Sequence, residues 1–86
     1  MRAQKRDKNE REIIEALEKI GAFVCPIDLP VDLLVLFRNR WHLMEIKGPV
    51  GRLTPYQVNF IRQAGESNVH VVRTPEEAIN ALLGAN

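Results

Sequence analysis

Residues 31–47 read VDLLVLFRNRWHLMEIK, and this stretch decides the fold. Residues 31–37 are apolar at odd and even positions alike, apart from Asp32, which is typical of a central strand covered on both faces. Residues 41–47 predict a second strand, and Arg38-Asn39-Arg40 predicts the turn between the two. The stretch therefore predicts a β-hairpin whose first strand lies inside a sheet.

The rest of the chain predicts further elements on both sides of this hairpin. Gly21 is a helix stop signal, and the last two helices each begin with a threonine cap, a proline, and Gln57 or Glu77 three residues after the cap. The predicted order is a helix at 9–20, strands at 22–25, 31–37 and 41–47, a helix from 54 to about 65, a strand at 69–72 and a helix at 74–83. This order predicts an α/β domain in which helices cover a mixed sheet.

Length and composition bound the possible classes of protein. The chain has 86 residues, too few for two domains, and 45% of them are hydrophobic, enough for one compact core. We therefore expect a single domain over residues 1–86. The net charge of +1 does not indicate a partner. The longest apolar run, 31–37, carries a charge and is too short to cross a bilayer, and the basic N-terminus leads into no hydrophobic segment. The single Cys25 suits a reducing cytoplasm, where we expect the protein to act.

Glu10 is a charged residue on the apolar stripe of the predicted first helix. At 100° per residue the stripe passes through Glu10, and its apolar members are Ile13, Ile14, Leu17 and Ile20. A carboxylate on a buried face needs a metal or a basic partner. The alternative is that Glu10 lies in the first turn, where the helix dipole and nearby water stabilise an acid. Both interpretations stay open.

Three charged residues converge at one end of the predicted hairpin. Side chains alternate along a strand, so Glu45 and Lys47 share one face while Ile46 enters the core. A short turn brings Asp32 beside them. The alternatives are an aspartate at a strand end that bonds a neighbouring turn, and a Glu–Lys pair on an exposed end of the sheet.

A bound metal would explain why these groups share one face. Asp32 and Glu45, with the main-chain carbonyl of Ile46, can hold Mg²⁺ against a scissile phosphate. A lysine beside them can position or deprotonate the attacking water and offset charge in the transition state. Gln57 is a polar residue on a second apolar stripe, formed by Tyr56, Phe60, Ile61 and Ala64, although it also completes a capping box with Thr54.

The ordered set of these residues resembles the PD-(D/E)XK nuclease superfamily, and more narrowly its VRR-NUC branch and the small phage-type proteins around it. The matching segments are DKNE (7–10), PVDLLV (30–35), EIKGP (45–49), LTPYQ (53–57) and VVRTPEEA (71–78). The resemblance covers nearly the whole chain and implies a restriction-endonuclease-like αβββαβ core. It implies that the metal ligands are Asp32, Glu45 and the Ile46 carbonyl, with Glu10 contributed by the first helix, Lys47 as the catalytic lysine and Gln57 as the supporting polar residue. Two features depart from the family pattern: Val31 stands where the motif has proline directly before the aspartate, and the segment before Asp32 lacks the glycine-rich stretch of many relatives.

The resulting hypothesis is a Mg²⁺- or Mn²⁺-dependent DNA endonuclease, with branched or junction DNA among its possible substrates. Arg6, Lys8 and Arg52 are the candidates for contacts with backbone phosphates. One domain has room for one site, so cutting two strands requires two copies, and we expect a homodimer. The resemblance also suggests a phage-encoded protein that acts in the host cytoplasm.

Two other hypotheses stay open. One is a catalytically silent nucleic-acid-binding module of the same fold, and the other is an assembly protein unrelated to nucleic acid. A metal titration separates these from a nuclease. His42 and His70 have no neighbouring histidine or asparagine partners of the kind that a histidine-metal site requires, so we expect no such site, and no P-loop is present.

Overall fold

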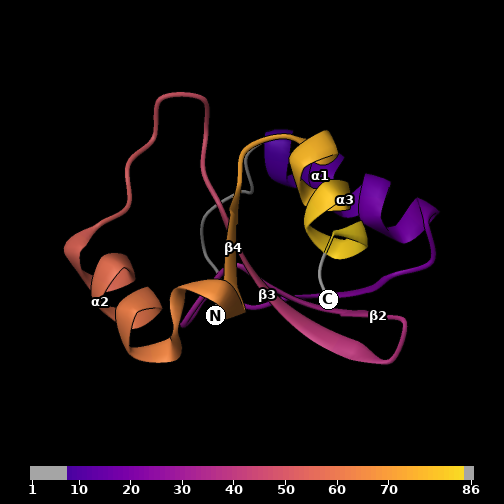
Figure 1. Ribbon diagram of the computed structural model, residues 1–86. Coiled ribbons are helices and arrows are strands. Elements are labelled where there is room, and N and C mark those ends of the chain that lie inside the picture. The colour runs from indigo at the N-terminus through magenta and orange to yellow at the C-terminus, as the bar shows by residue number, and fades with distance from the viewer. Residues whose placement is uncertain (1–7, 85–86) are drawn as a thin grey trace.

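The computed structural model describes the chain from residue 8 to residue 84 (Figure 1). The elements are, in order, α1 (Lys8–Lys19), β1 (Phe23–Pro26), β2 (Leu33–Phe37), β3 (Arg40–Ile46), α2 (Pro55–Ala64), the 3-10 turn η1 (Glu66–Asn68), β4 (Val69–Val72) and α3 (Pro75–Leu83). The predicted order of helices and strands is confirmed, and η1 is an addition. Among these residues no helix is long and apolar enough to cross a membrane.

The strands form one mixed sheet in the order β1-β2-β3-β4. The pairs β1–β2 and β2–β3 are antiparallel, and β3–β4 is parallel. β2 therefore lies inside the sheet, as its two apolar faces predict. The hairpin turn is shorter than expected: only Arg38 and Asn39 form it, with φ of 53° and 66°, and Arg40 already belongs to β3. Two consecutive residues with positive φ are typical of the tight turn that matches the twist of a hairpin.

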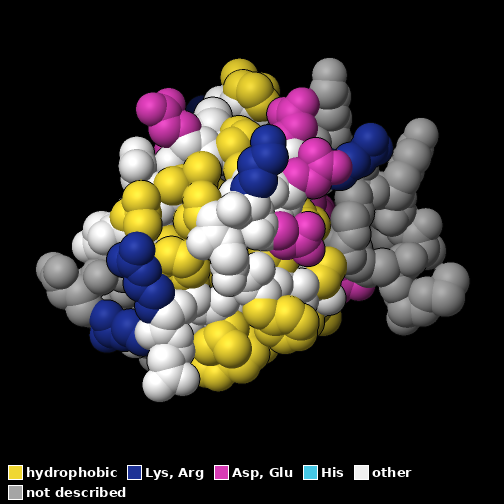
Figure 2. Space-filling model, turned by 90° about the vertical axis from the view of Figure 1, so that its right-hand side faces the viewer, with side chains coloured by type: hydrophobic (Ala, Val, Ile, Leu, Met, Phe, Trp, Pro, Cys, Tyr) yellow, Lys and Arg dark blue, Asp and Glu magenta, His cyan; other side chains and the backbone are white. Residues whose placement is uncertain are grey.

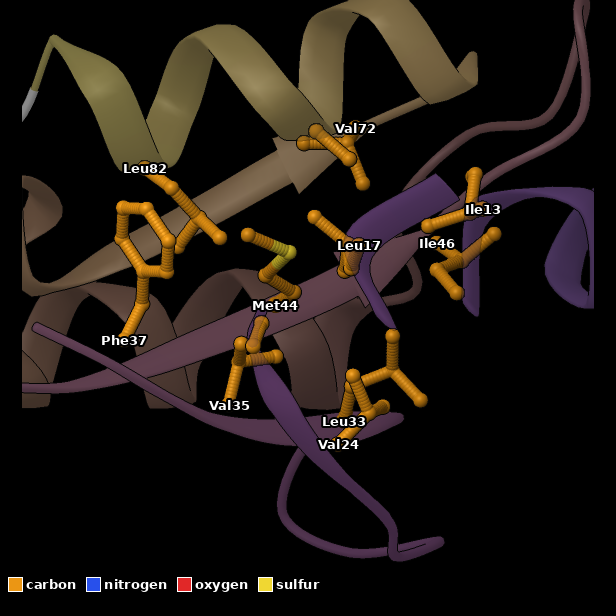
Figure 3. Packing of buried hydrophobic residues seen from close by; sticks show 12 residues of the cluster. Ile13, Leu17, Val24, Leu33, Val35, Phe37, Met44, Ile46, Val72 and Leu82 are labelled. Atoms are coloured by element: carbon orange, nitrogen blue, oxygen red, sulfur yellow. The ribbon is translucent and has the colours of Figure 1, made fainter. Parts of the chain in front are cut away.

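Helices α1 and α3 pack together over one face of the sheet (Figure 1). The core between them is apolar and closely packed (Figure 3). Its fully buried members include Ile13, Leu17, Leu33, Val35, Met44 and Val72. Each such side chain contributes about 1.5–3 kcal/mol by leaving water. The predicted stripe of α1 extends one residue too far, because the helix ends at Lys19 and Ile20 is 36% exposed.

The opposite face of the sheet is largely open. The register aligns Phe23, Leu36 and Trp41 in one row across β1, β2 and β3, and Phe23 and Trp41 are 58% and 55% exposed. Hydrophobic side chains gather at the lower margin of Figure 2, on the side of the sheet away from α1 and α3. We call this the open face. Helix α2 lies apart from the other two helices (Figure 1) and has no buried residue, so its predicted apolar stripe stays at least partly exposed.

Two histidines lie side by side on the core-facing side of β3 and β4. The ring centroids of His42 and His70 are 5.6 Å apart. Burial lowers the pKa of both imidazoles, and the charges of His70 and Arg40 lower that of His42 further. The two histidines are far apart in the sequence, and the parallel β3–β4 pairing brings them together in space. Among residues 8–84, however, no group of three histidine, cysteine or acidic side chains is placed to hold a metal.

Candidate functional site

Asp32 and Glu45 meet at the end of the β2–β3 pair away from the hairpin turn. Asp32 lies just before β2 and not within it, which corrects the predicted strand start. Its Oδ2 accepts a hydrogen bond of 2.8 Å from the Ile46 main-chain N–H, and its own carbonyl accepts one of 2.7 Å from Ile27. The aspartate therefore replaces a ladder partner at the point where the strand pairing ends. Its carboxyl lies close enough to that of Glu45 to raise the pKa of Glu45.

Glu45 is almost completely buried, and the pKa of its carboxyl is raised. Only 4% of the residue is exposed. The pKa of Glu45 is raised to about 7, chiefly by burial and also by the neighbouring Asp32 carboxyl, while Lys47 opposes the rise. Two carboxyl groups in contact repel each other once both are ionised. A divalent cation would relieve that repulsion, so this donor pair fits Mg²⁺ or Mn²⁺, which prefer oxygen ligands.

The Ile46 main-chain carbonyl completes the expected oxygen donors on the same side of β3. In a strand the N–H and C=O of one residue point to the same edge. Because the Ile46 N–H points to Asp32, its carbonyl faces that edge as well. Two carboxylates and one carbonyl can thus converge where β2 begins and β3 ends.

Lys47 lies beside the carboxylates, one residue beyond the end of β3. Its Nζ is 3.7 Å from Glu45 Oε2, and 15% of its side chain is exposed. Its backbone is held on both sides: the N–H donates to Val72 O at 3.0 Å, and the carbonyl accepts from Asn9 Nδ2 at 3.1 Å. The lysine ammonium is therefore held near the acidic pair while still reaching solvent.

Gln57 joins helix α2 to Glu45 through a local cap. Its Oε1 accepts from the Thr54 N–H at 2.8 Å, and Thr54 Oγ1 accepts from the Gln57 N–H at 3.2 Å, which completes the predicted capping box. The cap leaves Nε2 as the free end of the amide, and Nε2 donates to Glu45 Oε2 at 2.7 Å. Gln57 can therefore form the cap and the bond to Glu45 together. The cap holds the amide in the orientation that points Nε2 at Glu45.

Glu10 is buried, with 5% exposure, as the helical stripe predicts. It lies in the first turn of α1, next to the Asn9 that binds Lys47. The described residues do not place Glu10 with Asp32 and Glu45 in a single three-acid group. Its role as a metal ligand stays a prediction.

Of the three residues predicted to contact backbone phosphates, the structure describes the side chain of Arg52 alone. Arg52 is exposed on the segment between β3 and α2, where a phosphate can reach it. Arg6 lies outside the described residues, and so does the side chain of Lys8. Their contacts with nucleic acid stay predictions.

Sequence reasoning missed two residues that hold the site. Asn9 contacts Lys47 across 38 residues of sequence, and nothing in the local pattern distinguishes it. Arg73 follows β4 and donates through Nη1 to the carbonyls of Gly48, at 2.5 Å, and Gly51, at 2.9 Å. Only its position directly after an apolar strand, before the Thr74 cap, could have drawn attention to it.

Comparison of the chain with protein-family models, with curated proteins and with solved structures finds no match. Any proposal on function therefore rests on the residues and their geometry.

Proposed function

We propose that this protein is a Mg²⁺- or Mn²⁺-dependent deoxyribonuclease with a restriction-endonuclease-like core. The observation that carries the proposal is the contact of Asp32 with Glu45 at one end of the sheet, with the Lys47 ammonium 3.7 Å from Glu45. An acid pair and a lysine on one site are the groups that phosphodiester hydrolysis requires. The element order and the mixed sheet, with α2 apart from α1 and α3, support the proposed core.

Asp32, Glu45 and the Ile46 carbonyl would hold the cation. When bound, it supplies Lewis acidity at the scissile phosphate. Lys47 orients the attacking water and offsets the negative charge that develops on the phosphate oxygens. Gln57 holds Oε2 of Glu45, so that the carboxylate keeps one orientation. Arg52 lies on the adjacent loop and contacts a backbone phosphate, with Arg6 and Lys8 as further candidates.

Cleavage of a panel of labelled DNAs tests the proposal. The panel contains single-stranded, duplex, flap, splayed and four-way DNA in Mn²⁺ or Mg²⁺, beside Lys47→Ala and the control Lys19→Ala, an exposed lysine at the end of α1. We expect cleavage by the wild type and by Lys19→Ala, and a loss of roughly 100- to 1,000-fold in Lys47→Ala. If the folded wild type cleaves none of these DNAs, the result would instead support a nucleic-acid-binding or assembly module.

We also propose that a second copy of the chain covers the open face. An apolar row with exposed aromatics is typical of an interaction surface, and the exposed arginines Arg38 and Arg40 stand at its rim. A stable interface buries roughly 800 Å² per partner. The open face of three short strands offers less area than that. We therefore propose that the contact extends over α2, where Tyr56 is 55% exposed.

Sedimentation at micromolar concentration measures this association. We expect a dimer for the wild type and a folded monomer for Trp41→Lys, because a charge within the apolar row cannot be desolvated without large cost. The control is Leu83→Lys, which changes a similarly exposed apolar residue on α3, across the sheet. A monomeric wild type, or a dimer in Trp41→Lys, contradicts the proposed surface.

A further inference from the structure

Helix α2 carries Gln57 to the site but is weakly attached to the rest of the protein. None of its residues is buried. It follows β3 through residues 47–54, a segment without regular structure. The hydrogen bond between Gln57 and Glu45 needs α2 at one position, and an amphipathic helix with no buried residue does not secure that position by packing alone. Another contact must therefore restrain the segment.

Arg73 supplies a restraint of this kind from the neighbouring strand. One guanidinium nitrogen, Nη1, donates to both Gly48 O and Gly51 O. These two carbonyls bracket a turn that is closed by the Gly51 N–H, which donates to Gly48 O at 3.1 Å. A charged donor bonds a carbonyl more strongly than a neutral donor does, and here one nitrogen bonds both carbonyls. The side chain therefore holds the turn closed from the end of β4.

The other end of Arg73 is fixed as well. Its main-chain N–H donates to Glu77 Oε1 at 2.7 Å. This contact departs from the capping box expected for α3, in which Glu77 would bond the cap residue itself; the Thr74 hydroxyl still accepts from the Glu77 N–H at 3.0 Å. Arg73 thus joins the start of α3 to the turn that follows Lys47.

The turn in question touches Lys47 directly. A Cβ placed on Gly51 would lie 3.6 Å from the Lys47 Cδ and 3.4 Å from the Gly48 nitrogen, so the turn lies against the lysine stem. Movement of the turn would displace Lys47 on one side and Gln57 on the other. Both contact the same atom, Glu45 Oε2.

We propose that Arg73 is a positioning residue, which fixes the 48–51 turn and thereby places Lys47 and Gln57 on Glu45. The proposal rests on the proposed nuclease function for its kinetic consequence, and on the described contacts alone for its structural one. Arg73 acts through the turn and not on the substrate. Its loss therefore impairs the chemical step more than the binding of DNA or metal.

Kinetics of Arg73→Ala and Arg73→Lys test the first consequence. Loss of a group that orients a site residue typically costs about 10- to 100-fold. We expect kcat to fall by that factor in both variants, because lysine cannot reproduce the guanidinium geometry between the two carbonyls, while KM and the Mn²⁺ affinity change less than about threefold. Free guanidinium should restore part of the kcat of Arg73→Ala. The control is Arg11→Ala, an exposed arginine on α1.

NMR of the metal-free protein tests the second consequence without any reaction. The side-chain NH₂ of Gln57 should give a protected, shifted signal in the wild type, and should move toward that of the exposed Gln63 in Arg73→Ala. The Gly51 amide should exchange faster with solvent. If the wild type cleaves no DNA, the nuclease proposal fails, yet these signals still decide whether Arg73 positions Gln57.

Unchanged Gln57 and Gly51 signals in Arg73→Ala overturn the proposal, and so does a loss confined to KM. Should Arg73→Ala not fold, Arg73→Lys carries the same comparison, since it keeps the charge and the length of the side chain. A Lys variant with wild-type kcat and wild-type signals shows that charge alone suffices and contradicts the geometric role.

Discussion

Asp32→Asn and Glu45→Gln are each expected to lower DNA cleavage by roughly 1,000-fold or more while the fold stays intact. Each change removes a charge and keeps the shape. The new amide oxygen at position 32 can still accept from the Ile46 N–H, and that at position 45 can still accept from Gln57. A neutral amide binds a divalent cation much less strongly than a carboxylate, so the electrostatic stabilisation of the transition state is lost.

Single-turnover cleavage at high Mn²⁺ measures this loss, and circular dichroism reports the fold. The matched control is Glu15→Gln, which neutralises an exposed carboxylate on α1. It should cleave at the wild-type rate. Cleavage at the wild-type rate by Asp32→Asn or Glu45→Gln would assign the acid pair a structural role, and unfolding of both variants would do the same.

Glu45→Gln is also expected to be more stable than the wild type at pH 8 without metal. The pKa of Glu45 is raised from 4.5 to about 7 in the folded state, so the fold favours the protonated carboxyl. Its stabilising effect is fully present below pH 4.5 and is lost as the pH rises to about 7. A pKa difference of this size corresponds to about 3 kcal/mol at most. At roughly 4–8 °C per kcal/mol for a domain of this length, the wild type should then melt at most about 12–24 °C below Glu45→Gln at pH 8.

Thermal melts in EDTA at pH 4.5, 6 and 8 measure this difference. It should shrink to a small remainder at pH 4.5, where the carboxyl is protonated in the folded state and half protonated in the unfolded state, whose pKa is 4.5. His42 and His70 act in the opposite direction, because their pKa values are lowered and stability falls as the pH drops below 6.5. This loss is common to both proteins, so the difference between their melting temperatures isolates Glu45. Equal melting temperatures at pH 8 would contradict the raised pKa.

Local sequence was sufficient wherever the cause of a structure lies within a few residues. Period-two and helical patterns predict the strands, the burial of Glu10 and the central position of β2. The Thr54 cap predicts where α2 begins. The pairing of Asp32 with Glu45 was also predictable, because a short hairpin leaves few registers and alternation puts Glu45 and Lys47 on one face. Family resemblance added roles for these residues, and those roles stay predictions.

Contacts between distant segments could not be predicted in this way. β2 begins after Asp32 because the Asp32 side chain, and not its main chain, bonds the Ile46 N–H. The periodicity of the sequence does not predict such a bond. Asn9 and Arg73 bind backbone carbonyls, and a carbonyl is present at every residue, so the pattern of side chains does not single out a partner. The contact of His42 with His70 arises from parallel pairing of two strands that are separated by a helix.

The sequence by itself determined the kind and order of the elements, the hairpin and the acid–acid–lysine set, because propensity, periodicity and capping act over one or two turns of chain. Only the tertiary structure decided that one sheet face stays open, that Glu45 is buried enough for a pKa of about 7, and that Arg73 holds the turn beside Lys47. Burial and long-range hydrogen bonds depend on which surfaces pack together, and that choice is made by the whole chain at once.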